Sequence, residues 1–254
     1  MALKERTDAL AAREAAVEAI PEMVASGSED VLRSLVENPA FDETHVCLLL
    51  ERKDLSGTLL EEISKRKAWR AAYRVRLALA AHPHTPRLIA MRLLRELHLM
   101  DLVRLSLLPA SPMELRRLAD ERVLTQLPQL ALGQKLMLAR RGSARIAAGL
   151  VAHGPDQVAR VALDNCFLTE SQLLKVLARQ ALTERTIACV ARHGKWSTLV
   201  NIRVALLRHP NVPEDCAAAL VSGLPRREME DLVELSRLSK GVRDLLRAEL
   251  ERTT

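Results

Sequence analysis

The chain has 254 residues, of which 48% are hydrophobic, 28% are charged and only 2% are aromatic. This balance excludes a disordered chain, and the abundance of Leu, Ala and Arg favours helices over strands. The net charge of +6 is moderate, and no uncharged apolar run approaches the ~20 residues that a membrane-spanning helix requires.

In chain order, the sequence predicts short helices separated by breaks, between charged amphipathic end helices at about 1–20 and 227–252. Proline lacks an N–H group and disfavours helix in the residue before it, so most breaks fall at such a pair. Short amphipathic helices cannot bury their apolar faces alone, so about ten units of about 22 to 26 residues are expected to stack. The breaks fall at Asn38-Pro39, near 53–58, and at His82-Pro83, Leu108-Pro109, Asp164-Asn165 and His209-Pro210.

The two tryptophans mark a longer repeat. Trp69 and Trp196 begin closely similar phrases, and 196 − 69 gives a repeat offset of 127. This repeat offset holds without a gap well upstream and downstream of both phrases. The sequence therefore predicts two tandem copies, residues 1–127 and 128–254.

Beyond the tryptophan phrases the best match shifts by three positions. Asp101 faces Asp231, and 231 − 101 gives an offset of 130. A surface loop at 224–230 is the expected place for the extra residues. Arg76 and Arg203, which are equivalent, are predicted to pair with these aspartates.

The proline-containing phrase resembles a known repeat. Residues 75–89 read Val-Arg-Leu-Ala-Leu-Ala-Ala-His-Pro-His-Thr-Pro-Arg-Leu-Ile, which is similar to the core of a leucine-rich repeat variant unit. Residues 102–118 and 202–216 match the unit more loosely. The resemblance implies an all-α, right-handed α-solenoid in the style of HEAT repeats, continuous over residues 1–254. Some family members bind an iron–sulfur cluster through N-terminal cysteines, and this chain lacks that cysteine cluster.

Residues kept in both copies are interpreted as architecture. Trp69 and Trp196 are predicted to pack between adjacent units rather than to stack on a ligand. His82 and His209 lie at helix ends, where an imidazole can bond free backbone groups and interact favourably with the helix dipole. No serine, cysteine or carboxylate recurs beside them in register, so catalytic histidines are not expected.

Two cationic stretches differ between the copies and are candidate binding surfaces. Residues 65–76 and 135–145 contain no acid. Lys67, Arg70 and Arg74 are spaced at i, i+3 and i+7, which predicts one stripe on a helix. Such surfaces suit an anionic partner, although ordinary solvated helix faces are the alternative. The candidate residues are Lys65, Arg66, Lys67, Arg70, Arg74, Lys135, Arg140, Arg141 and Arg145.

The sequence contains none of the GxGxxG, GxxxxGK[ST], HExxH or GxSxG motifs, so we expect no catalytic, cofactor or metal site. HEAT-like alkylpurine DNA glycosylases, which are similar at fold level only, are the nearest enzyme alternative. The start of the chain has acids and no apolar segment of a secretory signal, so a cytoplasmic location is expected. The four cysteines form no CxxC pair and are interpreted as reduced, buried residues: Cys47, Cys166, Cys189 and Cys216.

The expected function is that of a non-catalytic helical-repeat scaffold that binds a protein partner through its solenoid surface. The alternative is sequence-independent binding of duplex DNA or structured RNA through the two cationic stretches. An enzyme or a lipid-surface role is the remaining alternative. An apolar groove would favour the protein partner, whereas one continuous positive groove would favour nucleic acid. The identity of the partner and the oligomeric state do not follow from the sequence.

Overall fold

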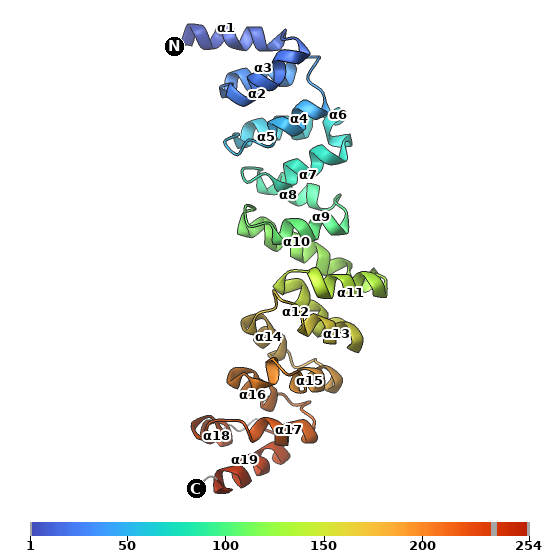
Figure 1. Ribbon diagram of the computed structural model, residues 1–254, viewed down its shortest axis with the longest axis vertical. Helices are drawn as coiled ribbons and strands as arrows, with labels where there is room; N and C mark the ends of the chain where they lie inside the picture. Colours follow the sequence, from blue (N-terminus) through green and yellow to red (C-terminus); the bar gives the residue numbers. More distant parts are fainter. Residues whose placement is uncertain (1, 235–237, 253–254) are drawn as a thin grey trace. The chain divides into compact units, whose positions relative to one another are not determined.

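The computed structural model describes residues 2–234 and 238–252, with side chains from Asp8 onward. Every regular element in these residues is a helix, so the chain is all-α. It divides into two compact units, residues 1–123 and 124–254 (Figure 1). Within the described ranges, no helix combines the length and the apolar character needed to cross a membrane.

The first unit contains short helices that follow one another along the unit (Figure 1). Helix α1 packs on α3, α2 on α4, α4 on α7, and α7 on α8. The end helix expected over 1–20 stops earlier, because α1 ends at Arg13 and a 3-10 turn follows. The elements are α1 (Ala2–Arg13), η1 (Val17–Ala19), α2 (Ile20–Ser26), α3 (Glu29–Glu37), α4 (Glu43–Leu49), α5 (Gly57–Lys65), α6 (Lys67–Ala71), α7 (Tyr73–Ala81), α8 (Arg87–Leu94), α9 (Leu99–Leu107) and α10 (Met113–Gln126), whose last residues belong to the second unit.

The second unit contains two rows of helices. Helices α11, α13, α15, α17 and α19 each pack on the next member of their row, and α12 packs on α14, which packs on α16 (Figure 1). The end helix expected over 227–252 is two helices, α18 and α19. The elements are η2 (Leu127–Gln129), α11 (Leu132–Arg141), α12 (Ala144–His153), α13 (Asp156–Leu163), α14 (Glu170–Leu177), α15 (Glu184–Ala191), η3 (Trp196–Thr198), α16 (Val200–Leu207), α17 (Glu214–Val221), α18 (Arg226–Val233) and α19 (Lys240–Arg252).

Equivalent positions in the two units begin and bury equivalent helices. Asp42 and Ser56 cap α4 and α5, and Thr169 and Thr183, their equivalents at the repeat offset, cap α14 and α15. Each side chain accepts a bond from the backbone N–H three residues on, at 3.1 to 3.4 Å. These bonds satisfy an otherwise unpaired donor at the start of the helix. Helices α3 and α13 bury the same four positions: Val31, Leu32, Leu35 and Val36 in α3, and Val158, Ala159, Ala162 and Leu163 in α13.

Two asparagines link the end of one helix to a helix two places earlier in the chain: α3 to α1, and α13 to α11. The Asn38 Nδ2 group donates to the carbonyl of Ala12 at 3.0 Å and to a second carbonyl three residues on. Asn165 donates to the carbonyl of Ala139 at 2.8 Å and again to a carbonyl three residues on. Both asparagines also accept the backbone N–H of the residue two places ahead. Each donor and acceptor of the bonds at Asn165 lies 127 residues after its equivalent in the bonds at Asn38, which is the repeat offset.

Two histidines form the corresponding links at the later breaks. His82 Nε2 lies 2.6 Å from the carbonyl oxygen of Arg52, and His209 Nε2 lies 3.0 Å from that of Arg179. The Nδ1 atoms accept the backbone N–H two residues ahead, so the Nε2 atoms carry the proton. Both side chains are buried, and the expectation that they bond backbone groups is confirmed.

The tryptophans are core residues. Trp69 packs edge-on against Phe41, with ring centroids 5.9 Å apart. Trp196 is only 1% exposed, and its Nε1 group donates to the carbonyl of Leu163 at 2.8 Å. Each contacts a segment from which two α-helices separate it in the chain, and both are buried, as packing between adjacent units requires.

The predicted three-position shift is wrong. Helix α18 begins at Arg226, which is the equivalent of Leu99, the start of α9, at the repeat offset. Helix α19 begins at Lys240, which is in the same way the equivalent of Met113, the start of α10. The expected surface loop at 224–230 is therefore mostly helix. The two Asp-Leu-Val phrases therefore occupy different positions in α9 and α18: the second phrase begins three positions later in its helix than the first does.

The predicted Arg–Asp pairs are also wrong. Arg76 Nη1 binds Glu96 Oε2 at 3.1 Å, and Asp101 instead accepts a bond from a tyrosine hydroxyl. The equivalent Arg203 donates from Nε to the carbonyl of Ser197 at 2.5 Å, and forms no ion pair within the described residues. The two arginines occupy equivalent positions in α7 and α16 but have different partners. Arg76 pairs with a glutamate, whereas Arg203 donates to a backbone carbonyl.

Candidate functional site

The first cationic stretch is partly occupied by contacts within the unit. Lys65, at the end of α5, forms an ion pair with Glu61 at 2.8 Å. The guanidinium of Arg66 lies 4.8 Å from the centre of the Trp69 ring, which stabilises it by a cation–π contact. These two cations therefore have partners already.

The single helical stripe expected from this stretch is wrong. Lys67 and Arg70 lie in α6, which ends at Ala71, whereas Arg74 lies in α7. Ala72 separates the two helices in an extended conformation, with ψ at 119°. The i, i+3, i+7 spacing therefore does not place these three cations on one helix.

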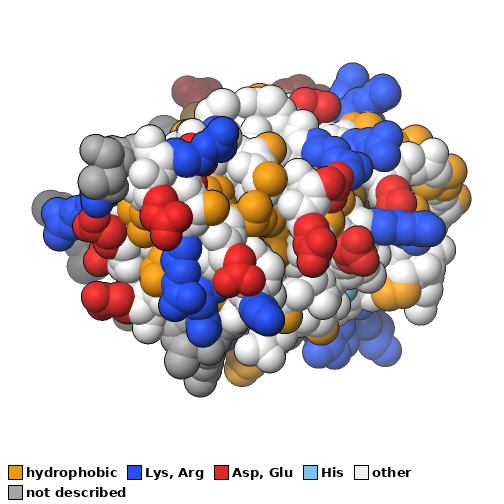
Figure 2. Space-filling view, turned by 90° about the horizontal axis from the view of Figure 1, so that it is seen from below, with side chains coloured by type: hydrophobic (Ala, Val, Ile, Leu, Met, Phe, Trp, Pro, Cys, Tyr) orange, Lys and Arg blue, Asp and Glu red, His pale blue; other side chains and the backbone are white. Residues whose placement is uncertain are grey.

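The second cationic stretch lies in the other unit. Lys135, Arg140 and Arg141 belong to α11, whereas Arg145 belongs to α12 beyond a break. Arg140 and Arg141 are exposed, and Lys135 and Arg145 are half-buried. On the face drawn in Figure 2, Lys and Arg side chains are interspersed with Asp and Glu side chains. That face does not carry one continuous positive surface.

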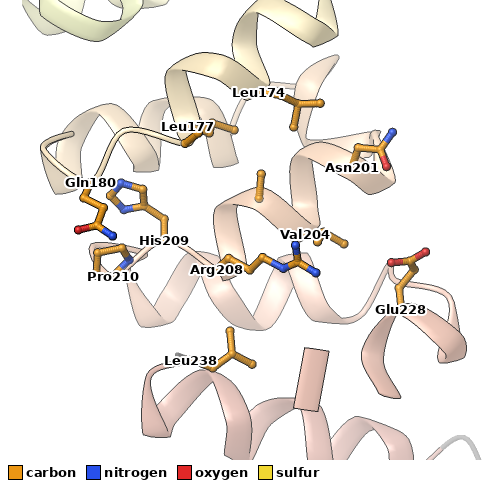
Figure 3. Close-up of a pocket in the computed structure, with 12 residues that line it drawn as sticks. Leu174, Leu177, Gln180, Asn201, Val204, Arg208, His209, Pro210, Glu228 and Leu238 are labelled. Atoms are coloured by element: carbon orange, nitrogen blue, oxygen red, sulfur yellow. The ribbon is translucent and has the colours of Figure 1, made fainter. Parts of the chain in front are cut away.

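A groove of about 650 Å³ lies in the second unit, over α14, α16 and the start of α18 (Figure 3). Its apolar lining comes from several separate elements of the unit. Leu174 and Leu177 lie one turn apart on α14, Val204 lies on α16, and Leu238 precedes α19. Leu174 and Val204 are half-buried, so each still presents apolar surface to the groove. No sequence motif pointed to this site.

Polar side chains edge the groove: Gln180, Asn201, Arg208 and Glu228 (Figure 3). Asn201 is held in place because its Nδ2 group donates to Glu170 Oε1 at 2.9 Å. Figure 3 shows the Arg208 side chain extending along the groove, with the Glu228 carboxylate toward one end. Within the described parts of the chain, Arg208 and Glu228 form no ion pair with each other or with another residue.

In the first unit, the acid at the position equivalent to Glu228 is held by a hydrogen bond. The Tyr73 hydroxyl donates to Asp101, and its ring stacks on His98 with centroids 4.2 Å apart. Burial, followed by the bond to Asp101, raises the pKa of Tyr73, which keeps the hydroxyl protonated as a donor. In the second unit Val200 and Glu228 are the equivalents of Tyr73 and Asp101 at the repeat offset. Valine has no hydroxyl, so Glu228 lacks this donor.

A second groove, of about 690 Å³, lies between α13 and α15 in the other row of the same unit. Its charges are largely paired, because Asp156 lies 3.8 Å from Arg185 and Asp164 lies 3.1 Å from His193. Burial raises the pKa of the Cys189 thiol, which keeps it protonated and unreactive at neutral pH. Because its charges are largely paired, this groove leaves fewer groups free to contact a partner than the apolar groove does.

All four cysteines are free thiols, but the expectation that all are buried is wrong. Cys216 is buried, Cys47 and Cys189 are half-buried, and Cys166 is exposed. Across residues 2–234 and 238–252, His, Cys, Asp and Glu side chains form no group of three or more that could hold a metal ion.

No protein-family model, curated protein or solved structure matches the chain. The similarity to leucine-rich repeat variants therefore stays a prediction that rests on residues 75–89 and their looser matches.

Proposed function

We propose that the chain is a non-catalytic helical-repeat scaffold that binds a protein partner through the groove over α14, α16 and α18. The groove itself carries this proposal. Its volume of about 650 Å³ falls within the range of about 300 to 1,000 Å³ that is usual for small-molecule pockets, so it has room for side chains of a partner. An apolar floor with a few polar groups at its edge is the arrangement in which an inserted side chain gains affinity and orientation.

We further propose that the scaffold is a solenoid built from two tandem copies. Helix starts, capping residues and break-residue hydrogen bonds recur at the one repeat offset, which supports a duplication. In the second unit, helices pack on their next-but-one neighbours in two rows, as solenoid units do. Repeats of this kind commonly use their surface for binding, which favours a scaffold role.

The test uses peptides displayed on phage and selected on the whole chain. Random peptides of about 16 residues can form about four helical turns, which is long enough to cover the groove. The affinity of each recovered peptide is measured by fluorescence anisotropy on the unaltered chain and on the Val204→Asp variant. A carboxylate in the apolar floor is expected to weaken binding at least about tenfold, because it must be desolvated.

The matched control is Leu77→Asp, which places the same charge at the equivalent position of the first unit. This variant should keep the affinity within about twofold, and circular dichroism should show that both variants stay helical. Recovery of no peptide, or equal affinity for the Val204→Asp variant and the unaltered chain, would remove the groove as the binding site.

Nucleic-acid binding through the cationic stretches is the second candidate function. Lys67 and Arg70 favour it, because neither forms an ion pair within the described residues. A salt-sensitive mobility shift of duplex DNA or structured RNA that disappears on reversing the charges of Lys67, Arg70 and Arg74 would support this candidate. An unchanged shift would exclude this surface.

A further inference from the structure

Two side chains of opposite charge line the groove of the second unit, so they restrict which apolar partners can bind there. Arg208 directly follows α16 and is exposed, and Glu228 lies half-buried in the first turn of α18. Resting on the proposed function, we propose that the groove binds an amphipathic helix that bears one acidic residue for Arg208 and one basic residue for Glu228.

Desolvation makes the two charges selective. A partner that covers Leu174, Val204 and Leu238 also removes water from Arg208 and Glu228, which line the same groove. Burying an ionised group without a partner is costly, because its hydration is lost and nothing replaces it. A purely apolar segment would incur that cost twice, so the occupant must supply an acid and a base.

The walls of the groove favour a helical occupant over an extended one. The lining residues belong to helices or to the segments that connect them, so the lining has no strand edge with which an extended peptide could pair. A helix satisfies its own backbone N–H and C=O groups, which suits an apolar groove between helices. Its apolar side chains would recur at i, i+3, i+4 and i+7.

The positions of the two charges set the order of the charges on the partner. Arg208 follows the last residue of α16, whereas Glu228 lies in the first turn of α18, so the two charges lie at different places along the groove. The acid and the base of the partner should therefore stand at different positions along one flank of the helix. Because the charges differ in sign, only one direction of the helix along the groove matches both.

The probe is the set of helical peptides selected on the whole chain. Anisotropy titrations compare their affinities for the unaltered chain and for the Arg208→Glu, Arg208→Gln and Glu228→Lys variants. Each charge reversal is expected to weaken binding about tenfold, and the neutral Arg208→Gln variant should weaken it less. Changing the acid of the peptide to Lys should restore its affinity for the Arg208→Glu variant.

The matched control is Arg227→Glu, which makes the same charge change at the exposed neighbour of Glu228, outside the groove lining. This variant should bind within about twofold of the unaltered chain. Peptides that lose binding on Val204→Asp but are insensitive to Arg208→Glu and Glu228→Lys would overturn the charged helix while leaving the groove as a docking site. Peptides that are insensitive to Val204→Asp would overturn both proposals.

Discussion

At the residue scale, the breaks between helices depend on side chains that bond backbone carbonyls of an earlier turn. Asn38 and Asn165 do so through an amide, and His82 and His209 do so through Nε2. Both side-chain types offer one donor for a remote carbonyl and one acceptor for the N–H two residues ahead. Asparagine and histidine are therefore equivalent at this position for a physical reason.

This equivalence predicts different outcomes for two substitutions at His82. His82→Ala leaves the buried carbonyl of Arg52 unpaired and should lower the free energy of unfolding by about 1–3 kcal/mol. His82→Asn should retain more of that stability, because at Asn38 an asparagine also donates to a remote carbonyl and accepts the N–H two residues ahead. Urea unfolding of both variants measures the difference. Equal losses would show that asparagine does not replace histidine at this break.

The same histidine gives a pH dependence. Burial lowers the pKa of His82 below its ordinary value of 6.5, and nearby Lys53 and His84 act in the same direction, against the Arg52 carbonyl and Asp54. The unfolded chain therefore takes up the proton first as the pH falls. The stability contributed by neutral His82 is full above about pH 6.5 and declines below it.

We expect the loss of stability between about pH 7.5 and pH 5.5 to be smaller in His82→Asn than in the unaltered chain. Urea titrations of the two proteins at both pH values give the comparison. An identical loss in the two proteins would assign the pH dependence to other groups.

At the element scale, the sequence predicts several breaks between helices but not the contacts that side chains form between helices. Proline pairs and apolar spacing place the breaks at Asn38 and His82 correctly, because both depend on local backbone sterics. The break at Ala72 was missed, since alanine is a good helix former and carries no local signal there. The offset of 130 at Asp101 was misleading, because short phrases of Asp, Leu and Val recur by chance in a leucine-rich chain.

The partner of each shared arginine also escaped prediction. Arg76 pairs with Glu96, but at the equivalent position of the second unit glycine stands in the place of that glutamate. A Cβ atom at Gly223 would overlap Arg203 Nη1, so the guanidinium occupies the space of the missing side chain. Arg203 then bonds backbone carbonyls, including that of Leu220 at 3.3 Å.

Gly223→Ala is therefore expected to displace the Arg203 guanidinium and to lower the free energy of unfolding by about 1–2 kcal/mol through lost hydrogen bonds. Gly194→Ala is the control, because a Cβ there meets nothing within 4 Å. Chemical denaturation of both variants checks the prediction. If Gly223→Ala also destabilises a chain that already carries Arg203→Met, the cost does not come from the arginine.

At the scale of the whole molecule, the two units share their helix register and differ in chemistry. Shared residues such as Trp196 and His209 are architectural, as the sequence predicts, but the sequence pointed to the cations as the main difference. The groove depends on side chains from different helices, such as Leu174 and Val204, that meet in space. Such contacts between helices follow from packing, which a one-dimensional pattern of charges does not record.

The most direct test is hydrogen exchange of the whole chain, followed by mass spectrometry, with and without a saturating selected peptide. Bound ligand slows exchange in the helices it stabilises, so protection reports the binding site. We expect protection in α14, α16 and α18, and none in α4, α7 and α9, which occupy the equivalent positions of the first unit. Protection confined to α6, α11 or the first unit, or no protection at saturation, would contradict the assignment of the groove as the docking site.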